Sequence, residues 1–514
     1  MKAFLMFRDQ DFDFQQKLPS NEPALTQDLE LNTLFNAMAL GDKFLFDVAK
    51  KTVLSKLCDP DAINYRQEIL KDCLKNPALV REIYRITIES IENKRRGWYG
   101  IFSRYPGGIL SSSITMLQMY IGQLKKLKNI ADEHANEFHS EGFTAFFAMI
   151  RRELDDEYFD SMQDHLRELK FRNGVLISAE LGKGNEGTHY ILRKPNKKES
   201  WMARIFAKRP PVYTYSLHPR DEAGARALSE LRDRGINLVA NALGQSADHV
   251  DSFFGMLRIE LAFYIACLNL YEQLIQMGEP ISFPVPVVAS ERRHSFQGLY
   301  DVCLALTMGQ KVVGNDVDAD HKDLVIITGA NQGGKSTFLR AIGLAQLMME
   351  CGMFVPAESF SANVCDGLFS HYKREEDVTM KSGKLAEELN RMSDIVDHIT
   401  SNSIVLFNES FAATNEREGS EIARQIVSAL LEQRVKIFFV THMYEFSHSL
   451  LFDNKMKNAI FLRAVREAEG KRTFKLVEGE PFDTSYGEDS YTKVFGGEES
   501  WPNERAGGPG NLSP

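Results

Sequence analysis

A glycine-rich segment at residues 329–337 contains the residue types that bind the phosphates of a nucleotide. Its spacing is G-x-x-x-x-G-K-[ST], with an apolar run at 324–328 before it and helix-forming residues after it. In such a loop, backbone N–H groups surround phosphate oxygens, and the start of the helix adds positive potential. We expect Lys335 to contact the β- and γ-phosphates and Ser336 to hold Mg²⁺; a glycine-rich turn with a chance lysine is the alternative. The expected nucleotide-binding residues of the loop are Gly329, Asn331, Gly333, Gly334, Lys335, Ser336 and Thr337.

A second apolar run, at residues 403–407, ends in Asn408 and Glu409. We expect Glu409 to orient or deprotonate an attacking water molecule. Asn408 takes the place where an acidic residue normally helps to hold Mg²⁺. Its amide oxygen accepts a hydrogen bond from metal-bound water but adds no charge, so weaker Mg²⁺ binding or slower hydrolysis follows. An ordinary strand end with no metal role is the alternative.

A third apolar run, at residues 436–441, ends in His442. Because the carboxyl ends of parallel strands meet at one edge of a sheet, His442 could contact the γ-phosphate there. A structural histidine is the alternative. The predicted catalytic residues are therefore Glu409, Lys335 and His442, and the predicted metal ligands are Ser336 and Asn408.

The elements that must position these residues alternate between strand-like and helix-like segments from residue 323 onward, which predicts a parallel sheet. Upstream, the periodicity is mainly helical, with short β-like runs after residue 171. The expected divisions are a helical core and lever at 1–170, a β-rich basic insertion at 171–220, lever helices at 221–300, a P-loop α/β domain at 301–495 and a disordered tail at 496–514.

Composition sets limits on the class of protein. The chain has 514 residues, 43% of them hydrophobic and 26% charged, which excludes wholesale disorder. Its net charge of −10 argues against a protein that coats nucleic acid through bulk charge. The six cysteines are scattered without a CxxC pair, which fits a reducing cytosol. No apolar stretch is long enough to predict a membrane span, so we expect a cytoplasmic protein without a membrane partner.

Several ordered motifs resemble the ATPase domain of the MutS family of DNA mismatch-repair proteins. The similar segments are Val-Val-Gly-Asn-Asp at 312–316, the phosphate loop at 328–337, Phe-Val-Pro-Ala at 354–357, Phe-Val-Thr-His at 439–442 and Thr-Ser-Tyr-Gly at 484–487. Weaker similarity at 61–67 and 251–277 extends the resemblance to the core and the lever of that family. The resemblance implies a multidomain fold, in which a mainly α-helical core and lever arm precede a P-loop α/β ATPase domain of the ABC type.

The resemblance also implies ATP and Mg²⁺ as cofactors and a homodimer with composite ATP sites. In that family a signature loop closes the partner's site, and Ser382 and Gly383 are the matching candidates here. A plain N-cap for the helix that begins at residue 384 is an equally good interpretation of this pair.

Departures from the family pattern affect the expected function. The only Phe-x-Glu is at 407–409, inside the ATP site, so mismatch reading by insertion of that phenylalanine is not expected. The aromatic residue that stacks on adenine in the family is replaced near Val312.

A basic strip at 193–209 lies where the family carries its DNA clamp, and it has seven basic residues against one acidic residue. Its members are Arg193, Lys194, Lys197, Lys198, Arg204, Lys208 and Arg209. Such a strip can neutralise phosphates in a salt-dependent way, whereas a solvated surface hairpin is the alternative. We expect an ATP-dependent repair or recombination protein that binds mismatched, branched or damaged DNA. The alternative function is an ATP-gated protein scaffold that does not bind DNA.

Overall fold

The computed structural model describes residues 1–97, 105–172, 174–194, 213–374, 383–452, 458–467 and 472–481. The chain divides into two compact units, one formed by residues 1–13 and 71–265 and the other by residues 14–70 and 266 onward. The boundaries between the units fall inside the helices α4 (Pro60–Lys75) and α10 (Glu222–Gln276).

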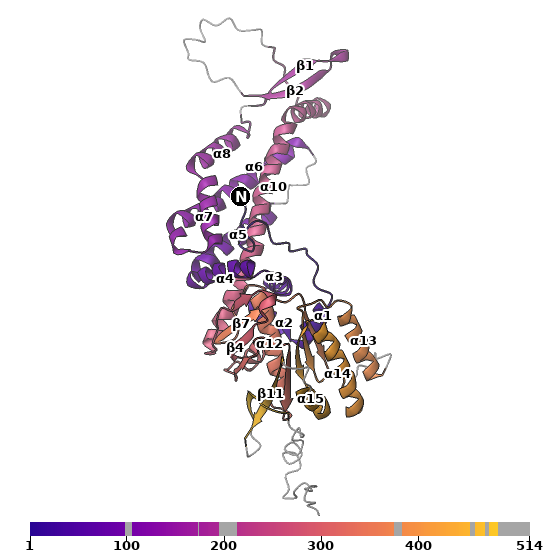
Figure 1. Cartoon of the computed structure of the whole chain (residues 1–514). Coiled ribbons are helices and arrows are strands. Elements are labelled where there is room, and N and C mark those ends of the chain that lie inside the picture. The colour runs from indigo at the N-terminus through magenta and orange to yellow at the C-terminus, as the bar shows by residue number, and fades with distance from the viewer. Residues whose placement is uncertain are drawn as a thin grey trace, which may run out of the picture. The chain divides into compact units, whose positions relative to one another are not determined.

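The first unit is mainly helical (Figure 1). Its other elements are α5 (Pro77–Gly97), α6 (Pro106–His134), α7 (Glu141–Glu153), α8 (Asp156–Glu168) and the hairpin of β1 (Leu176–Leu181) and β2 (Gly187–Arg193). Phe143 and Phe147 are buried side chains of α7, and their rings stack with centroids 5.8 Å apart. The helix α6 packs beside α10, where the Tyr120 hydroxyl donates to Asp251 at 2.9 Å.

The helix α10 is long and apolar enough to cross a membrane by length and composition alone. However, 78% of its most apolar window is buried inside the protein. Burial accounts for the apolar character of this window, as it does in a core helix.

The second unit contains a six-stranded sheet in the order β12-β11-β6-β10-β9-β8. All neighbouring pairs are parallel except β11 with β12, which confirms the predicted parallel arrangement of the three apolar runs. The strands are β6 (Leu324–Gly329), β8 (Leu368–Tyr372), β9 (Ile404–Asn408), β10 (Lys436–Val440), β11 (Ala459–Arg466) and β12 (Arg472–Glu478). The helices are α1 (Glu22–Asp28), α2 (Leu31–Ala39), α3 (Lys43–Leu54), α11 (Val302–Met308), α12 (Lys335–Glu350), α13 (Lys384–Val396), α14 (Glu416–Glu432) and α15 (Tyr444–Leu451).

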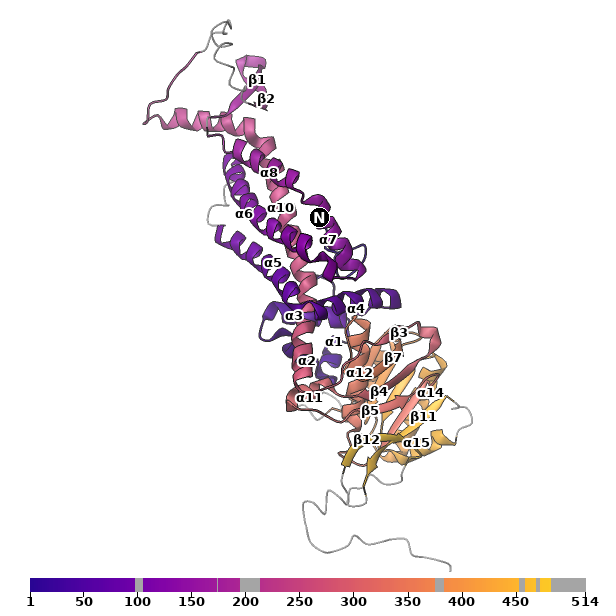
Figure 2. The same cartoon turned by 90° about the vertical axis from the view of Figure 1, so that its left-hand side faces the viewer.

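A second, four-stranded sheet of order β3-β7-β4-β5 was not expected from the sequence. Its strands are β3 (Val285–Val287), β4 (His294–Leu299), β5 (Asn315–Asp318) and β7 (Ser359–Asn363), and Figure 2 shows them close together in this unit. These strands are short. In the sequence, the phosphate loop and the helix after it separate β5 from β7. Sequence periodicity gives little signal for such strands.

Residues 14–70 pack with the unit that carries the phosphate loop, which differs from the expected division at residue 170. The helix α12 explains the difference, because most of its side chains are buried on all sides. A side chain at Gly343 would meet both Leu406 of β9 and Leu29, at 2.7 and 2.9 Å, so the larger sheet and the N-terminal segment cover α12 together. Arg66, also fully buried, donates to the carbonyl of Cys351 just beyond the end of α12 at 3.1 Å.

Candidate nucleotide-binding site

The phosphate loop connects β6 to α12, and its backbone requires glycine at two positions. Gly329 has φ +111° and Gly334 has φ +86°, a region that residues with a side chain rarely adopt. A Cβ atom at Gly329 would also lie 2.8 Å from the backbone nitrogen of Ala464 on the adjacent strand β11. Gly334 precedes the first residue of α12, so the loop delivers its backbone N–H groups to the start of a helix.

Lys335 is 5% exposed, and its ammonium group lies inside the loop. Nζ donates to the carbonyl oxygens of Gly329 and Ala330, at 3.0 Å each. Burial lowers the pKa of Lys335, with a smaller opposing effect from the Glu409 carboxylate and a further lowering by Arg472. A cation held by carbonyl oxygens in this position can change partners to phosphate oxygens when a nucleotide enters.

The structure brings Ser336 and Asn408 together although 72 residues separate them in the sequence. The Ser336 hydroxyl donates to the Asn408 amide oxygen at 2.8 Å. Both oxygens suit Mg²⁺, which prefers oxygen ligands and usually keeps several waters and substrate phosphates. Within the described part of the chain, no group of three or more His, Cys, Asp or Glu side chains could hold a metal by itself.

Glu409 and His442 follow adjacent parallel strands and meet beside the loop. Glu409 Oε1 lies 3.8 Å from His442 Nδ1, and Oε2 lies 3.9 Å from Lys373 Nζ. The imidazole lowers the pKa of Glu409, burial opposes this, and the cations of Lys373 and Lys335 add to the lowering. Glu409 is therefore ionised at neutral pH. It also has φ +52°, a strained conformation for a non-glycine residue that is typical of functional sites.

A cavity of about 540 Å³ opens next to the loop and continues past Lys335, Ser336 and Glu409. Apolar side chains also line it, among them Leu304, Met308, Val312 and Phe474. A cavity that combines phosphate-binding groups with apolar walls suits a nucleotide with a planar base.

Sequence reasoning did not identify Phe474, which lies on the edge strand β12 and is 47% exposed. A Cβ atom at Gly334 would be 3.5 Å from its ring, so the ring covers the loop. Phe474 has φ +58°, which departs from the extended backbone of the strand. No local pattern in the sequence predicts this conformation.

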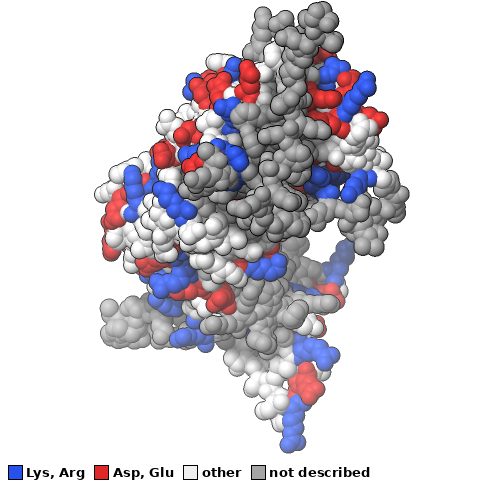
Figure 3. All heavy atoms as spheres, turned by 90° about the horizontal axis from the view of Figure 1, so that it is seen from below, with Lys and Arg blue, Asp and Glu red and all other residues white. Residues whose placement is uncertain are grey.

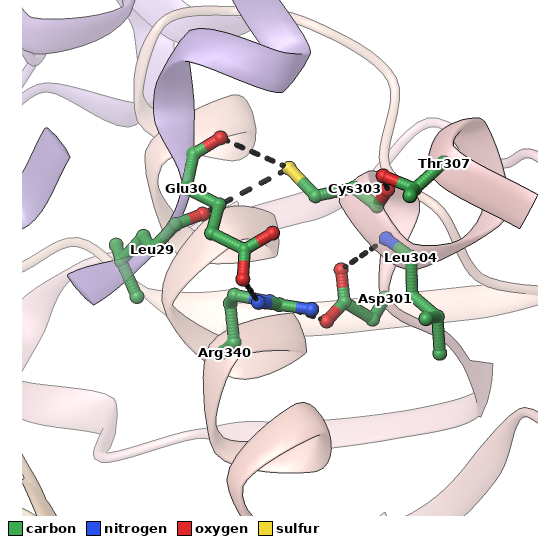
Figure 4. Close-up of polar contacts among 7 residues, drawn as sticks. All are labelled: Leu29, Glu30, Asp301, Cys303, Leu304, Thr307 and Arg340. Atoms are coloured by element: carbon green, nitrogen blue, oxygen red, sulfur yellow. Dashed lines mark hydrogen bonds and ion pairs between the residues drawn. The ribbon is translucent and has the colours of Figure 1, made fainter. Parts of the chain in front are cut away.

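The wall formed by α11 is anchored to the phosphate-loop helix and to the N-terminal segment (Figure 4). Arg340 on α12 forms ion pairs with Asp301 and with Glu30. Asp301 also accepts a hydrogen bond from the backbone of Leu304 at 3.0 Å, which caps α11. The cavity wall thus depends on residues far from the phosphate loop in the sequence.

Three more of the expected site residues are among those that the structure describes, and none of the three lines this cavity. Gly383 is the N-cap residue of α13. Arg193 donates to the Ser178 hydroxyl at 3.1 Å, and Lys194 lies 3.3 Å from Glu168 in an exposed ion pair. Outside the described residues lie Ser382, Lys197, Lys198, Arg204, Lys208, Arg209 and the Thr-Ser-Tyr-Gly segment at 484–487.

Comparisons with known proteins identify similarity over two parts of the chain. Residues 58–277 match the family model described as the MutS2 N-terminal domain, and residues 325–493 match MutS domain V. A DNA mismatch repair protein MutS of Microcystis aeruginosa is 23% identical over 86% of this chain and 55% of that protein. Proteins of the same name from Parabacteroides distasonis and Thermotoga maritima are each 34% identical, over 34% and 45% of this chain and 21% and 29% of those proteins. The chain therefore spans about half or less of the length of these relatives.

Proposed function

Because this chain belongs to the MutS family, we propose that it binds and slowly hydrolyses ATP with Mg²⁺ and uses the nucleotide to control binding to DNA. The observation that carries the ATPase proposal is the meeting of Ser336 and Asn408 at 2.8 Å, with Glu409 and Lys335 lining the same cavity. These residues come from two separate stretches of sequence, and an ordinary glycine-rich turn would not gather them.

Each residue has a distinct part in the proposed reaction. Lys335 and the loop N–H groups bind the β- and γ-phosphates, and the cavity beyond them takes the base. Ser336 and Asn408 would hold Mg²⁺, which would supply positive charge to the phosphates. Glu409 would orient the attacking water and accept its proton, while His442 would hold the Glu409 carboxylate in place and contact the γ-phosphate.

Replacing Asn408 with Asp is expected to increase Mg²⁺ affinity about fivefold. A charged acceptor stabilises a hydrogen bond by about 1 kcal/mol more than a neutral one, and Asp keeps the oxygen that accepts from Ser336. The measurement is the Mg²⁺ concentration that gives half-maximal ATP hydrolysis. Gln433→Glu, which adds the same charge at an exposed position beyond α14, is the control. If wild type and N408D require the same Mg²⁺ concentration, Asn408 does not take part in Mg²⁺ binding.

We further propose a cytoplasmic homodimer in which the Ser382 and Gly383 segment of one copy closes the ATP site of the other. Gly383 supports this role, because a Cβ atom there would meet nothing within 4 Å and its backbone is accessible. The same residue also begins α13, and the two roles are compatible.

The proposed DNA contact is the basic strip at 193–209, which interrupts a chain of net charge −10. On the face drawn in Figure 3, basic and acidic side chains are interspersed over the described surface. A strong local contact with phosphates therefore fits the strip better than the described surface of this face. The expected ligand is a mismatched, branched or damaged duplex.

Replacing Lys197, Lys198 and Arg204 together with Ala is expected to flatten the salt dependence of DNA binding. Each lost phosphate contact lowers the slope of log affinity against log salt by about 0.9. Fluorescence titrations with plain, mispaired and branched duplexes, with and without ATP, measure this slope. The double variant of the exposed Lys17 and Lys43 is the control. An unchanged slope would show that the strip is not the DNA contact. If the wild-type chain binds none of these duplexes at low salt, the alternative of a protein scaffold would be favoured.

A further inference from the structure

The 55-residue helix α10 ends at Gln276, shortly before a residue that contacts the wall of the cavity. Gly278, with φ +73°, turns the chain out of the helix. The backbone N–H of Glu279 then donates to the carbonyl of Leu274 at 3.1 Å. This arrangement fixes Glu279 immediately beyond the helix, with its side chain 3% exposed.

The buried Glu279 carboxylate reaches the loop between α11 and β5. Its Oε1 accepts a hydrogen bond from the backbone N–H of Val312 at 2.7 Å. Lys311, Val312 and Val313 all line the cavity. Burial raises the pKa of Glu279, and the hydrogen bond from Val312 and the charge of Lys311 oppose the rise.

A second buried group lies in the same place. The Tyr300 hydroxyl and Glu279 Oε2 are both buried and have no hydrogen-bond partner among the residues that the structure describes. Burial and the charge of Glu279 raise the pKa of Tyr300, so the hydroxyl stays protonated. Tyr300 also lines the cavity, which places two polar groups without partners behind its apolar wall.

We propose that Glu279 is a positioning residue for the nucleotide, which holds the 311–313 wall in the conformation that accepts the base and sugar. The inference rests on the proposed ATP-binding function. Glu279 does not contact the phosphates; it acts through the backbone of Val312. The contribution of Glu279 to binding affinity should therefore depend on the part of the ligand that reaches this wall. The affinity for a ligand made only of phosphates should not depend on Glu279.

The test compares ATP with inorganic tripolyphosphate, both with Mg²⁺, by calorimetric titration of the full chain. In Glu279→Ala we expect ATP affinity to fall about tenfold or more, since a buried hydrogen bond to a charged group is lost. Tripolyphosphate affinity should stay within about twofold. Glu279→Gln should recover most of the ATP affinity, because the amide oxygen still accepts from Val312.

Glu350→Gln is the matched control. Glu350 is another buried carboxylate of this unit that accepts a backbone N–H, from Cys365 at 2.7 Å, and it does not line the cavity. It should leave the ratio of the two affinities unchanged. The ratio is measured on one preparation, so it does not depend on the fraction that is folded.

Two results would overturn the inference. One is an unchanged ATP affinity in Glu279→Ala, and the other is an equal loss for ATP and tripolyphosphate, which would indicate a general structural role. A wild-type chain that binds neither ligand would instead overturn the proposed ATP-binding function itself.

Discussion

Replacing Glu409 with Gln is expected to lower the rate of ATP hydrolysis by about 10²–10⁴-fold, the usual contribution of a positioned general base. ATP binding should change little, because the phosphate loop, Lys335 and Ser336 remain. The physical reason is that Gln can donate and accept hydrogen bonds but cannot accept the proton of the attacking water. Single-turnover release of inorganic phosphate measures the chemical step directly.

The control for this variant is Glu421→Gln, which removes a carboxylate from an exposed position on α14. It should hydrolyse ATP at the wild-type rate. If Glu409→Gln keeps that rate too, Glu409 is not the base, and the interaction with His442 at 3.8 Å is structural.

Replacing Lys335 with Ala is expected to weaken ATP binding by about 30-fold or more. A hydrogen bond between charged groups contributes about 2 kcal/mol or more when it is shielded from water, and each 1.4 kcal/mol is a factor of ten. Lys335 is buried and lines the cavity, so its loss also removes a positive charge from the proposed phosphate site. Displacement of a fluorescent ATP analogue measures the affinity.

The control for Lys335 is Lys311→Ala, which removes another lysine that lines the cavity but lies outside the phosphate loop. It should affect affinity far less than Lys335→Ala, because the proposed phosphate site is the loop. Equal losses in the two variants would indicate that only general positive charge attracts the nucleotide.

The fold of the unit that carries the phosphate loop could be predicted from its continuous apolar runs. The strands that contain Val325, Leu406 and Phe438 are buried on both faces, so their side chains are apolar at every position. The short strands β3, β5 and β7 could not be predicted, because three to five residues carry no readable period. The packing of residues 14–70 against α12 also left no local signal, since it depends on complementary surfaces such as Gly343 and Leu29.

The same contrast holds for the site. Gly329, Gly334, Lys335 and Ser336 lie in one segment whose spacing is enough to predict a phosphate loop. Asn408, Glu409 and His442 were predictable because parallel strands end at one edge of the sheet. Phe474 and Tyr300 were not, because each reaches the cavity through long-range packing. Glu279 was not either, because it contacts the cavity wall only through the distant backbone of Val312.

The most direct test of the account is an equilibrium titration of the wild-type chain with ATP in the presence of Mg²⁺. We predict saturable binding of one ATP per chain below about 1 mM, the upper end of ordinary substrate affinities. Removal of Mg²⁺ should weaken this binding. No saturable binding in that range would contradict the assignment of the 329–337 loop and its cavity as an ATP site.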